Sequence, residues 1–170
     1  MMVCPLPSSV KYQIPKSVSL VEKKCDRPTN NLKVIYNIPR PGEEKESFVV
    51  CSKQLSILED LSLQIAEWFE ILRVLGAKKL DLKTITNHKN IDKVLDYYHD
   101  LGFVEKSDIT LPGPLPNILN LTHKYLYERI QNRESIEQLI YSDCLYRNMY
   151  KYQYIAVLGI KHPFHTSQKT

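Results

Sequence analysis

The stretch EILRVLGAKKLDL, residues 70–82, joins the end of one regular element to the start of another. Apolar residues at helical spacing run up to Leu75, Gly76 follows as a stop, and an alternating stretch begins at Leu80. This pattern predicts a helix, a glycine C-cap and a strand. DYYHDLGFVEKSDI, residues 96–109, repeats the layout with its own glycine. Strands that alternate with helices in this way predict βαβ units and a parallel sheet.

Four strands are expected along this part of the chain. The first three are Phe48–Cys51, Leu80–Ile85 and Phe103–Ile109. The fourth is an unbroken apolar run from Tyr154 that ends at Gly159, and such a run is typical of a strand buried on both faces. In open α/β proteins, ligands bind just beyond the carboxyl ends of such strands.

The segment before the fourth strand is expected to be helical. A short helix is predicted within residues 117–131. Ser135 and Gln138 fit a capping box, which predicts a third long helix from Ser135 to about Tyr150. The resulting order β-α-β-α-β-α-β is the first half of a nucleotide-binding α/β sheet.

The first 45 residues have a different composition. They hold six of the ten prolines and two short strand-like pieces, Ser17–Val21 and Leu32–Tyr36. We expect a small β-rich segment there, with no catalytic residues of its own.

Composition excludes several classes of protein. The 170 residues carry a net charge of +4 without any block of like charge or nucleic-acid-reading motif, so we expect no nucleic-acid partner. No apolar run approaches the length of a membrane span, and the first residues do not form a secretory signal, so the chain is expected to lack an anchor of its own. The cysteines at 4, 25, 51 and 144 lack zinc-finger spacing, and either two disulfides or four thiols would accommodate them.

Individual polar residues allow more than one interpretation. Asn87, at the mouth of the second strand, is expected either to cap the following helix or to contact a bound nucleotide. Asp143 and Arg147 are spaced for a surface ion pair on the third helix. Glu67 and Glu70 are interpreted as solvated carboxylates that flank a buried stripe, and His162 and His165 as part of a disordered tail instead of a metal pair.

Several stretches together resemble glycosyltransferase family 92. They are FVVC (48–51), EWFEILRVLGAKK (67–79), NIDKVLDYYHDLGFVE (90–105) and QLIYSDCLYRNMYKYQYIAVL (138–158). MVCPLP (2–7), Val18–Cys25 and CDRPTNNLKVIY (25–36) also resemble the pre-catalytic region of the family, so the resemblance covers nearly everything from residue 2 to 158. It implies a GT-A fold, with residues 1–45 as a pre-catalytic segment, 46–158 as the nucleotide-sugar-binding half and 159–170 as a polar tail foreign to the family.

The resemblance also implies an activity. Such enzymes transfer a sugar, galactose in described members, from a UDP-sugar donor to a glycan acceptor in the Golgi lumen. They are single-pass type II membrane proteins and use a divalent metal, commonly Mn²⁺. The dication stabilises the negative charge of the departing diphosphate. By the same resemblance, Asn87, Gln138 and Asp143 are the residues expected near the nucleotide sugar.

The metal motif of the family is the point of departure. The fourth strand of the family leads into Asp-x-Asp-Glu, whereas this chain has Gly159, Ile160, Lys161 and His162. We therefore expect no metal ligand and no catalytic residue here, and a truncated or alternatively spliced fragment that lacks the acceptor half and is inactive alone. The alternative is a non-catalytic interaction or decoy module that associates with a full-length relative through the unpaired edge of the fourth strand.

Overall fold

The computed structural model describes residues 5, 8–10, 13–39, 42–111, 113–115, 117–128 and 130–160. The chain divides into two compact units, one up to Ile38 and one from Pro39 onward. The boundary between these two compact units does not test the domain bounds predicted at residues 45 and 158, which stay a prediction. Residues 161–170, including the two histidines of the expected tail, lie outside the described part of the chain.

The first unit is small. Its described residues contain a 3₁₀ turn, Ser8–Val10, and two short antiparallel strands, β1 (Ser17–Val18) and β2 (Leu32–Lys33). Both strands fall within the two pieces predicted from the sequence. Asn30 mimics a strand partner for Leu20, since its amide donates to the Leu20 carbonyl at 2.7 Å and accepts from the Leu20 N–H at 2.8 Å.

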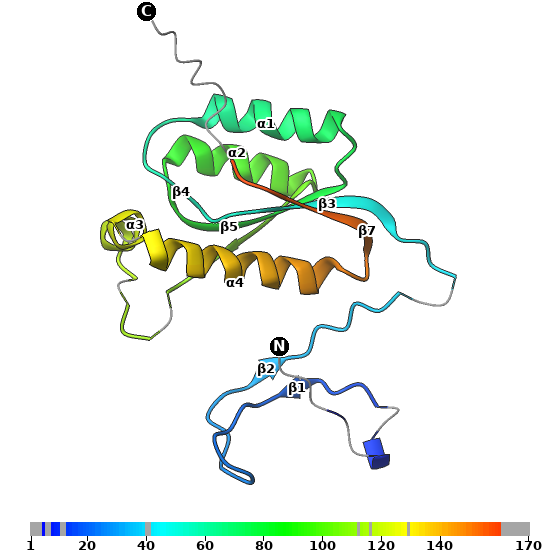
Figure 1. The fold of residues 1–170 in the computed structure, drawn as a ribbon. Coiled ribbons are helices and arrows are strands. Elements are labelled where there is room, and N and C mark those ends of the chain that lie inside the picture. The colour runs from blue at the N-terminus through cyan, green and yellow to red at the C-terminus, as the bar shows by residue number, and fades with distance from the viewer. Residues whose placement is uncertain are drawn as a thin grey trace, which may run out of the picture. The chain divides into compact units, whose positions relative to one another are not determined.

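The second unit is a mixed α/β structure around a parallel sheet of five described strands (Figure 1). In chain order its elements are β3 (Glu46–Ser52), β4 (Leu55–Ile57), α1 (Ser62–Val74), β5 (Lys79–Asn87), α2 (Lys89–Asp100), β6 (Val104–Asp108), α3 (Leu119–Glu128), α4 (Ile130–Asn148) and β7 (Tyr152–Leu158). The expected α/β class and the alternation of strands and helices are confirmed. Among the described residues, no helix combines the length and apolarity that crossing a bilayer requires.

The strand order is that of a Rossmann-like half sheet. Leu80 of β5 pairs with Val50 of β3 on one side and with Val104 of β6 on the other. β4 follows β3 after a short break and pairs with β5 on the same side as β3 does. β7 pairs with the other side of β3. If β3 and β4 count as the first strand, the order is third, second, first, fourth, which is the order of the nucleotide-binding half of a doubly wound sheet.

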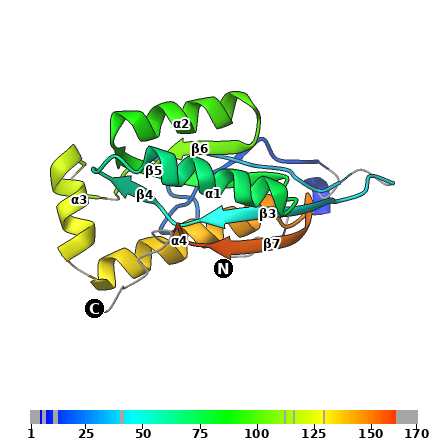
Figure 2. The ribbon, with the colours of Figure 1, turned by 90° about the horizontal axis from the view of Figure 1, so that it is seen from above.

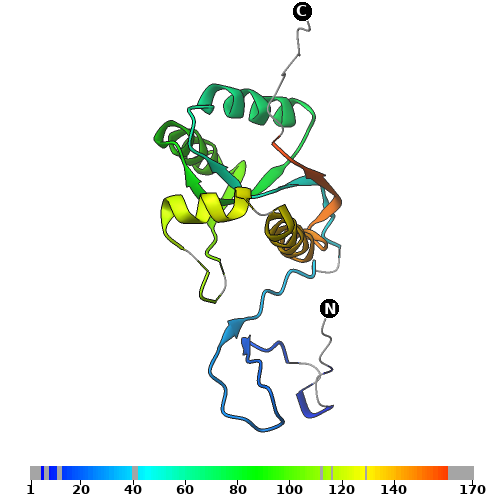
Figure 3. The same ribbon diagram turned by 60° about the vertical axis from the view of Figure 1, so that its left-hand side comes forward.

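The helices cover both faces of this sheet. α1 and α2 lie on one face and α4 on the other, and α3 lies beside the start of α4 (Figures 1 and 3). Seen from above, α1 lies nearer to β3 and α2 lies nearer to β6 (Figure 2). Crossovers between parallel strands are right-handed. The strands are added on one side of β3 up to β6, and β7 is added on its other side, so the helix before β7 lies on the opposite face of the sheet from α1 and α2.

The sequence correctly predicts how α1 and α2 end. Both helices close with a Schellman motif, in which the N–H groups of a glycine and of the next residue donate back to the last turn. The glycines are Gly76, with φ of +89°, and Gly102, with φ of +75°. Each motif then directs the chain into the next strand, so the shared Leu-Gly layout is the local cause of the βαβ repeat.

The main core lies between the sheet and the α1–α2 layer. Phe69 is fully buried at its centre and packs edge-on against Tyr98, with ring centroids 5.0 Å apart. A second cluster lies under α3 and α4; its buried members are Leu111, Leu126, Ile136 and Ile140. Burying apolar area of this kind is the main driving force for the fold.

Three details differ from the sequence-based expectations. The capping box is wrong, because α4 begins at Ile130 and Ser135 therefore lies inside the helix. β7 is not buried on both faces: it is an edge strand, and Tyr154 and Val157 are 72% and 54% exposed. β4 has no counterpart among the predicted strands, since three residues are too short for a period-2 pattern.

Candidate functional site

The carboxyl ends of β3 and β7 lie side by side. Ser52, the last residue of β3, is in register with Leu158, the last residue of β7. The chain therefore leaves the sheet at Lys53 and at Gly159 as neighbours. This position is the topological switch point of the sheet, where open α/β proteins bind their ligands.

A lysine side chain occupies this switch point. The Cε and Cδ atoms of Lys53 lie 3.7 and 3.8 Å from the place where a Cβ of Gly159 would stand. Lys53 thus rests over a residue without a side chain. Ile160, which follows, is half-buried and packs against the main core.

These residues do not fit a divalent cation. Manganese and magnesium need oxygen ligands, chiefly carboxylates. The switch point instead presents a glycine, an apolar side chain and the stem of a lysine. No group of three or more histidine, cysteine, aspartate or glutamate side chains that could hold a metal ion exists in the described residues.

A second feature lies at the carboxyl end of β5. A pocket of about 390 Å³ opens between β5, β6 and α2; its lining is Thr84, Ile85, Thr86, Asn87, Asp92, Leu95, Lys106 and Asp108. The hydroxyl of Thr86 is buried there and has no hydrogen-bond partner among the described residues. Buried hydroxyls are normally paired, so this oxygen is an unsatisfied polar atom in the wall of the pocket.

Asn87 lies in this pocket but does not cap α2. Its amide donates to Asp92 at 3.3 Å and accepts from the Ile57 N–H at 3.4 Å. The N-cap is His88, whose Nδ1 accepts from the Asn90 N–H at 3.3 Å. The predicted capping role of Asn87 is therefore wrong, and its predicted position at the mouth of the strand is correct.

The other two predicted site residues lie on α4. The two oxygens of Asp143 share one hydrogen bond from Arg147 Nε, at 2.7 and 2.8 Å, as the spacing predicted. It also pairs at 3.2 Å with Lys83, which comes from the middle of β5. Gln138 is an exposed residue of α4. No hydrogen bond or ion pair between described residues joins Asn87 to Gln138 or Asp143, so the structure does not bring the three together.

Near the start of α1, Asp60 connects two helix N-termini. It accepts hydrogen bonds from the Ser62 hydroxyl at 2.7 Å and from the Asn90 amide at 2.6 Å. These bonds, that from Ser62 first, lower the pKa of Asp60 to about 2. The carboxylate therefore stabilises the turn between β4 and α1.

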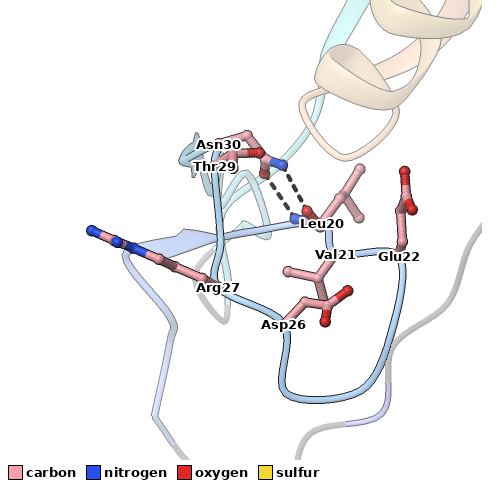
Figure 4. A pocket seen from close by; sticks show the side chains of 7 residues that line it. All are labelled: Leu20, Val21, Glu22, Asp26, Arg27, Thr29 and Asn30. Atoms are coloured by element: carbon pink, nitrogen blue, oxygen red, sulfur yellow. Dashed lines mark hydrogen bonds between the residues drawn. The ribbon is translucent and has the colours of Figure 1, made fainter.

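The first unit has a hollow of its own, of about 520 Å³ (Figure 4). It lies between two limbs of one loop, which Asn30 and Leu20 hold together. Arg27 extends away from the other labelled side chains, and Val21 and Leu20 contribute exposed apolar groups (Figure 4). Its polar groups do not converge on one point, so the switch point and the β5 pocket are the better candidate sites.

Sequence reasoning missed Lys53 and Thr86. A lysine after a strand and a threonine within one are ordinary residues in sequence. Only the pairing of β3 with β7 shows that Lys53 lies beside Gly159.

Comparison with known proteins identifies one family. The family model for glycosyltransferase family 92 matches residues 46–160, which is most of the second unit and more than half of the chain. Neither the curated proteins nor the solved structures include a match. The matched range begins at the first residue of β3, so the resemblance of the preceding residues to the family stays a prediction.

Proposed function

Because this chain belongs to glycosyltransferase family 92, we propose that its parallel sheet is the half of a GT-A enzyme that binds a nucleotide-sugar donor. The donor is a UDP-linked hexose such as UDP-galactose, and the acceptor of the complete reaction is a glycan. The observation that carries the proposal is the strand order, which creates a switch point between β3 and β7.

Asn87 is the predicted residue that fits this proposal best. Its amide lies at the carboxyl edge, in a pocket whose other polar groups include Thr86 and Asp92. Amide and carboxylate groups can hydrogen-bond the hydroxyls of a ribose and the polar edge of a base. Asp143 supports the proposal less, because it is already paired with Lys83 and Arg147. Gln138 also supports it less, because it is an exposed residue of α4.

The proposal includes a lack of transfer activity with Mn²⁺. A dication at the switch point would face the Lys53 side chain and would find no carboxylate on Gly159 or Ile160. Like charges repel, so a half-buried lysine beside this position disfavours a dication. We therefore propose that the residues described at this position do not support the metal-dependent route of the family.

The disulfide supports a secretory location for the protein. Cys51 of β3 and Cys144 of α4 are bonded, and both are buried. Structural disulfides persist in oxidising compartments and are rare in the cytosol. We therefore propose that the chain folds in the secretory pathway, in keeping with the Golgi lumen expected for the family.

Two assays on the purified, oxidised chain test this function. Isothermal titration calorimetry with UDP and GDP is expected to show binding with a preference for UDP. A transfer assay with UDP-galactose, Mn²⁺ and a glycan acceptor is expected to show no product. Absence of UDP binding would overturn the donor-half proposal, and measurable turnover would overturn the proposed inactivity.

A second candidate function rests on the exposed edge of β7. Tyr154, Val157 and Leu158 are exposed on a strand whose outer backbone groups have no partner strand in the described residues. Such an edge is a template for pairing with another chain. The non-catalytic alternative is thus an interaction module that adds a strand from a full-length relative or from a second copy.

A further inference from the structure

Two cationic side chains converge near the switch point. Lys53 leaves the end of β3, and Arg133 lies near the start of α4. Both line one small pocket, with Gln54, Ser56, Leu126 and Glu137. The pocket holds only about 40 Å³, so an anion would lie across its mouth with one oxygen inside.

The positive charge of this pair is poorly neutralised. Arg133 Nε lies 3.9 Å from Glu137 Oε1, at the outer limit of an ion pair. The Lys53 ammonium has no ion-pair or hydrogen-bond partner among the described residues. Two cations against one carboxylate leave a net charge of about +1 at the carboxyl edge of the sheet.

A buried polar group in the same pocket also lacks a partner. Gln54 Oε1 is inaccessible to solvent and forms no hydrogen bond within the described residues. A 180° rotation of the amide exchanges its oxygen and nitrogen, so the same position presents either an acceptor or an N–H donor. The pocket is therefore lined by an ammonium, a guanidinium and, in its wall, a buried amide that the described residues leave unsatisfied.

We propose that Lys53 and Arg133 form a binding site for a diphosphate that works without a divalent metal. The inference rests on the proposed donor-half function and names what binds the phosphates. Arg presents a planar pair of N–H groups to phosphate oxygens, and Lys adds a point charge. Gly159 makes room for the lysine stem, so in this chain a lysine side chain lies beside the strand end at which the family is expected to hold a dication.

The test is calorimetric titration of the oxidised chain with UDP and, separately, with inorganic pyrophosphate. Each titration is run once in EDTA and once in Mn²⁺. We expect both ligands to bind in EDTA, with little change on addition of Mn²⁺. Lys53→Gln and Arg133→Gln are each expected to weaken binding roughly tenfold or more, the range for a lost hydrogen bond to a charged group.

Matched variants separate the site from general charge. Lys78→Gln removes an exposed lysine at the opposite, amino-terminal edge of the sheet and is expected to leave binding unchanged. Gly159→Asp adds a carboxylate beside Lys53 and is expected to weaken binding in EDTA. Circular dichroism of each variant confirms that the fold is retained.

The outcomes distinguish the two proposals. UDP binding that requires Mn²⁺, or that survives both Lys53→Gln and Arg133→Gln, overturns the metal-free site and leaves the donor-half function standing. Pyrophosphate binding that depends on Lys53 and Arg133, without any UDP preference over GDP, supports the anion site and overturns the nucleotide specificity. Failure of both ligands to bind under all conditions overturns both.

Discussion

Lys83 is the most deeply buried cation among the described residues. Its side chain is 9% exposed, and its ammonium lies 3.1 Å from Asp81 Oδ1 and 3.2 Å from Asp143 Oδ2. The Asn148 amide lies 3.4 Å from the other Asp81 oxygen and donates to the Cys144 carbonyl at 2.9 Å. This network connects α4 to the face of the sheet that the helix covers. Asp143 therefore has a structural role.

Removal of Lys83 should therefore destabilise the fold. Lys83→Met leaves the buried Asp81 carboxylate without its cation, and breaking a buried pair in this way costs about 3–5 kcal/mol. The measurement is the free energy of unfolding in urea. Lys79→Met on the same strand is the control, because its pair with Glu105 is partly exposed and should contribute about 0–1 kcal/mol. Equal losses in the two variants would contradict the assignment.

Asp60 should make stability depend on acid pH. Its pKa of about 2 in the folded chain is below its ordinary value of 3.8, so its stabilising contribution is complete above pH 3.8 and is lost as the pH falls towards 2. Asp60→Asn removes this contribution. The difference in unfolding free energy between the natural chain and the variant should shrink between pH 4 and 2. A difference that does not change over this range would refute the role of the carboxylate.

Between elements, the Cys51–Cys144 bond joins the central strand to the longest described helix. It closes a loop of 93 residues, and both sulfurs lie among buried groups. Long closed loops restrict the unfolded chain most in the chain-entropy model. The bond therefore holds α4 against the sheet together with the Lys83 network.

Loss of this disulfide should be costly. The double variant Cys51→Ala and Cys144→Ala is expected to lose about 2–5 kcal/mol of unfolding free energy. Cys25→Ser changes an exposed free cysteine and should alter stability by less than about 0.5 kcal/mol. Thermal unfolding of the three proteins, with and without reductant, makes the comparison. Insensitivity of the natural chain to the reductant would argue against the bond.

The helices and strands show which features of the fold sequence patterns can predict. The helix–glycine–strand repeat predicted α1, α2 and the parallel sheet, because glycine stops and periodicity are local properties. The start of α4 was missed, since Ser135 and Gln138 satisfy a capping pattern inside a continuing helix. Of the predicted site residues, Asn87 lies where it was expected, at the carboxyl end of β5, and its role stays a prediction. The position of Lys53 beside Gly159 results from the pairing of β3 with β7, which joins residues more than a hundred positions apart.

On the scale of the whole molecule, the sheet ends at an exposed apolar edge. β7 carries no charged residue between Tyr152 and Leu158, so nothing on the strand itself opposes pairing with another strand. The apolar run that predicted a doubly buried strand is instead an edge strand with exposed apolar side chains.

We expect the chain to self-associate as its concentration rises. Val157→Lys places a charge on the β7 edge and should shift the population towards monomer. Leu63→Lys on α1, another exposed apolar position, is the control and should not. Sedimentation velocity over a concentration series measures both. A natural chain that stays monomeric at all concentrations would count against the interaction-module alternative.

The most direct test of the donor-half account is a map of where UDP acts on the protein. Hydrogen–deuterium exchange of the oxidised chain is measured with and without UDP, in EDTA. The account predicts slower exchange at residues 52–54, 86–88 and 158–160, where β3, β5 and β7 end. Protection confined to the first unit or to the outer surface of α4, with no change at these strand ends, would contradict it.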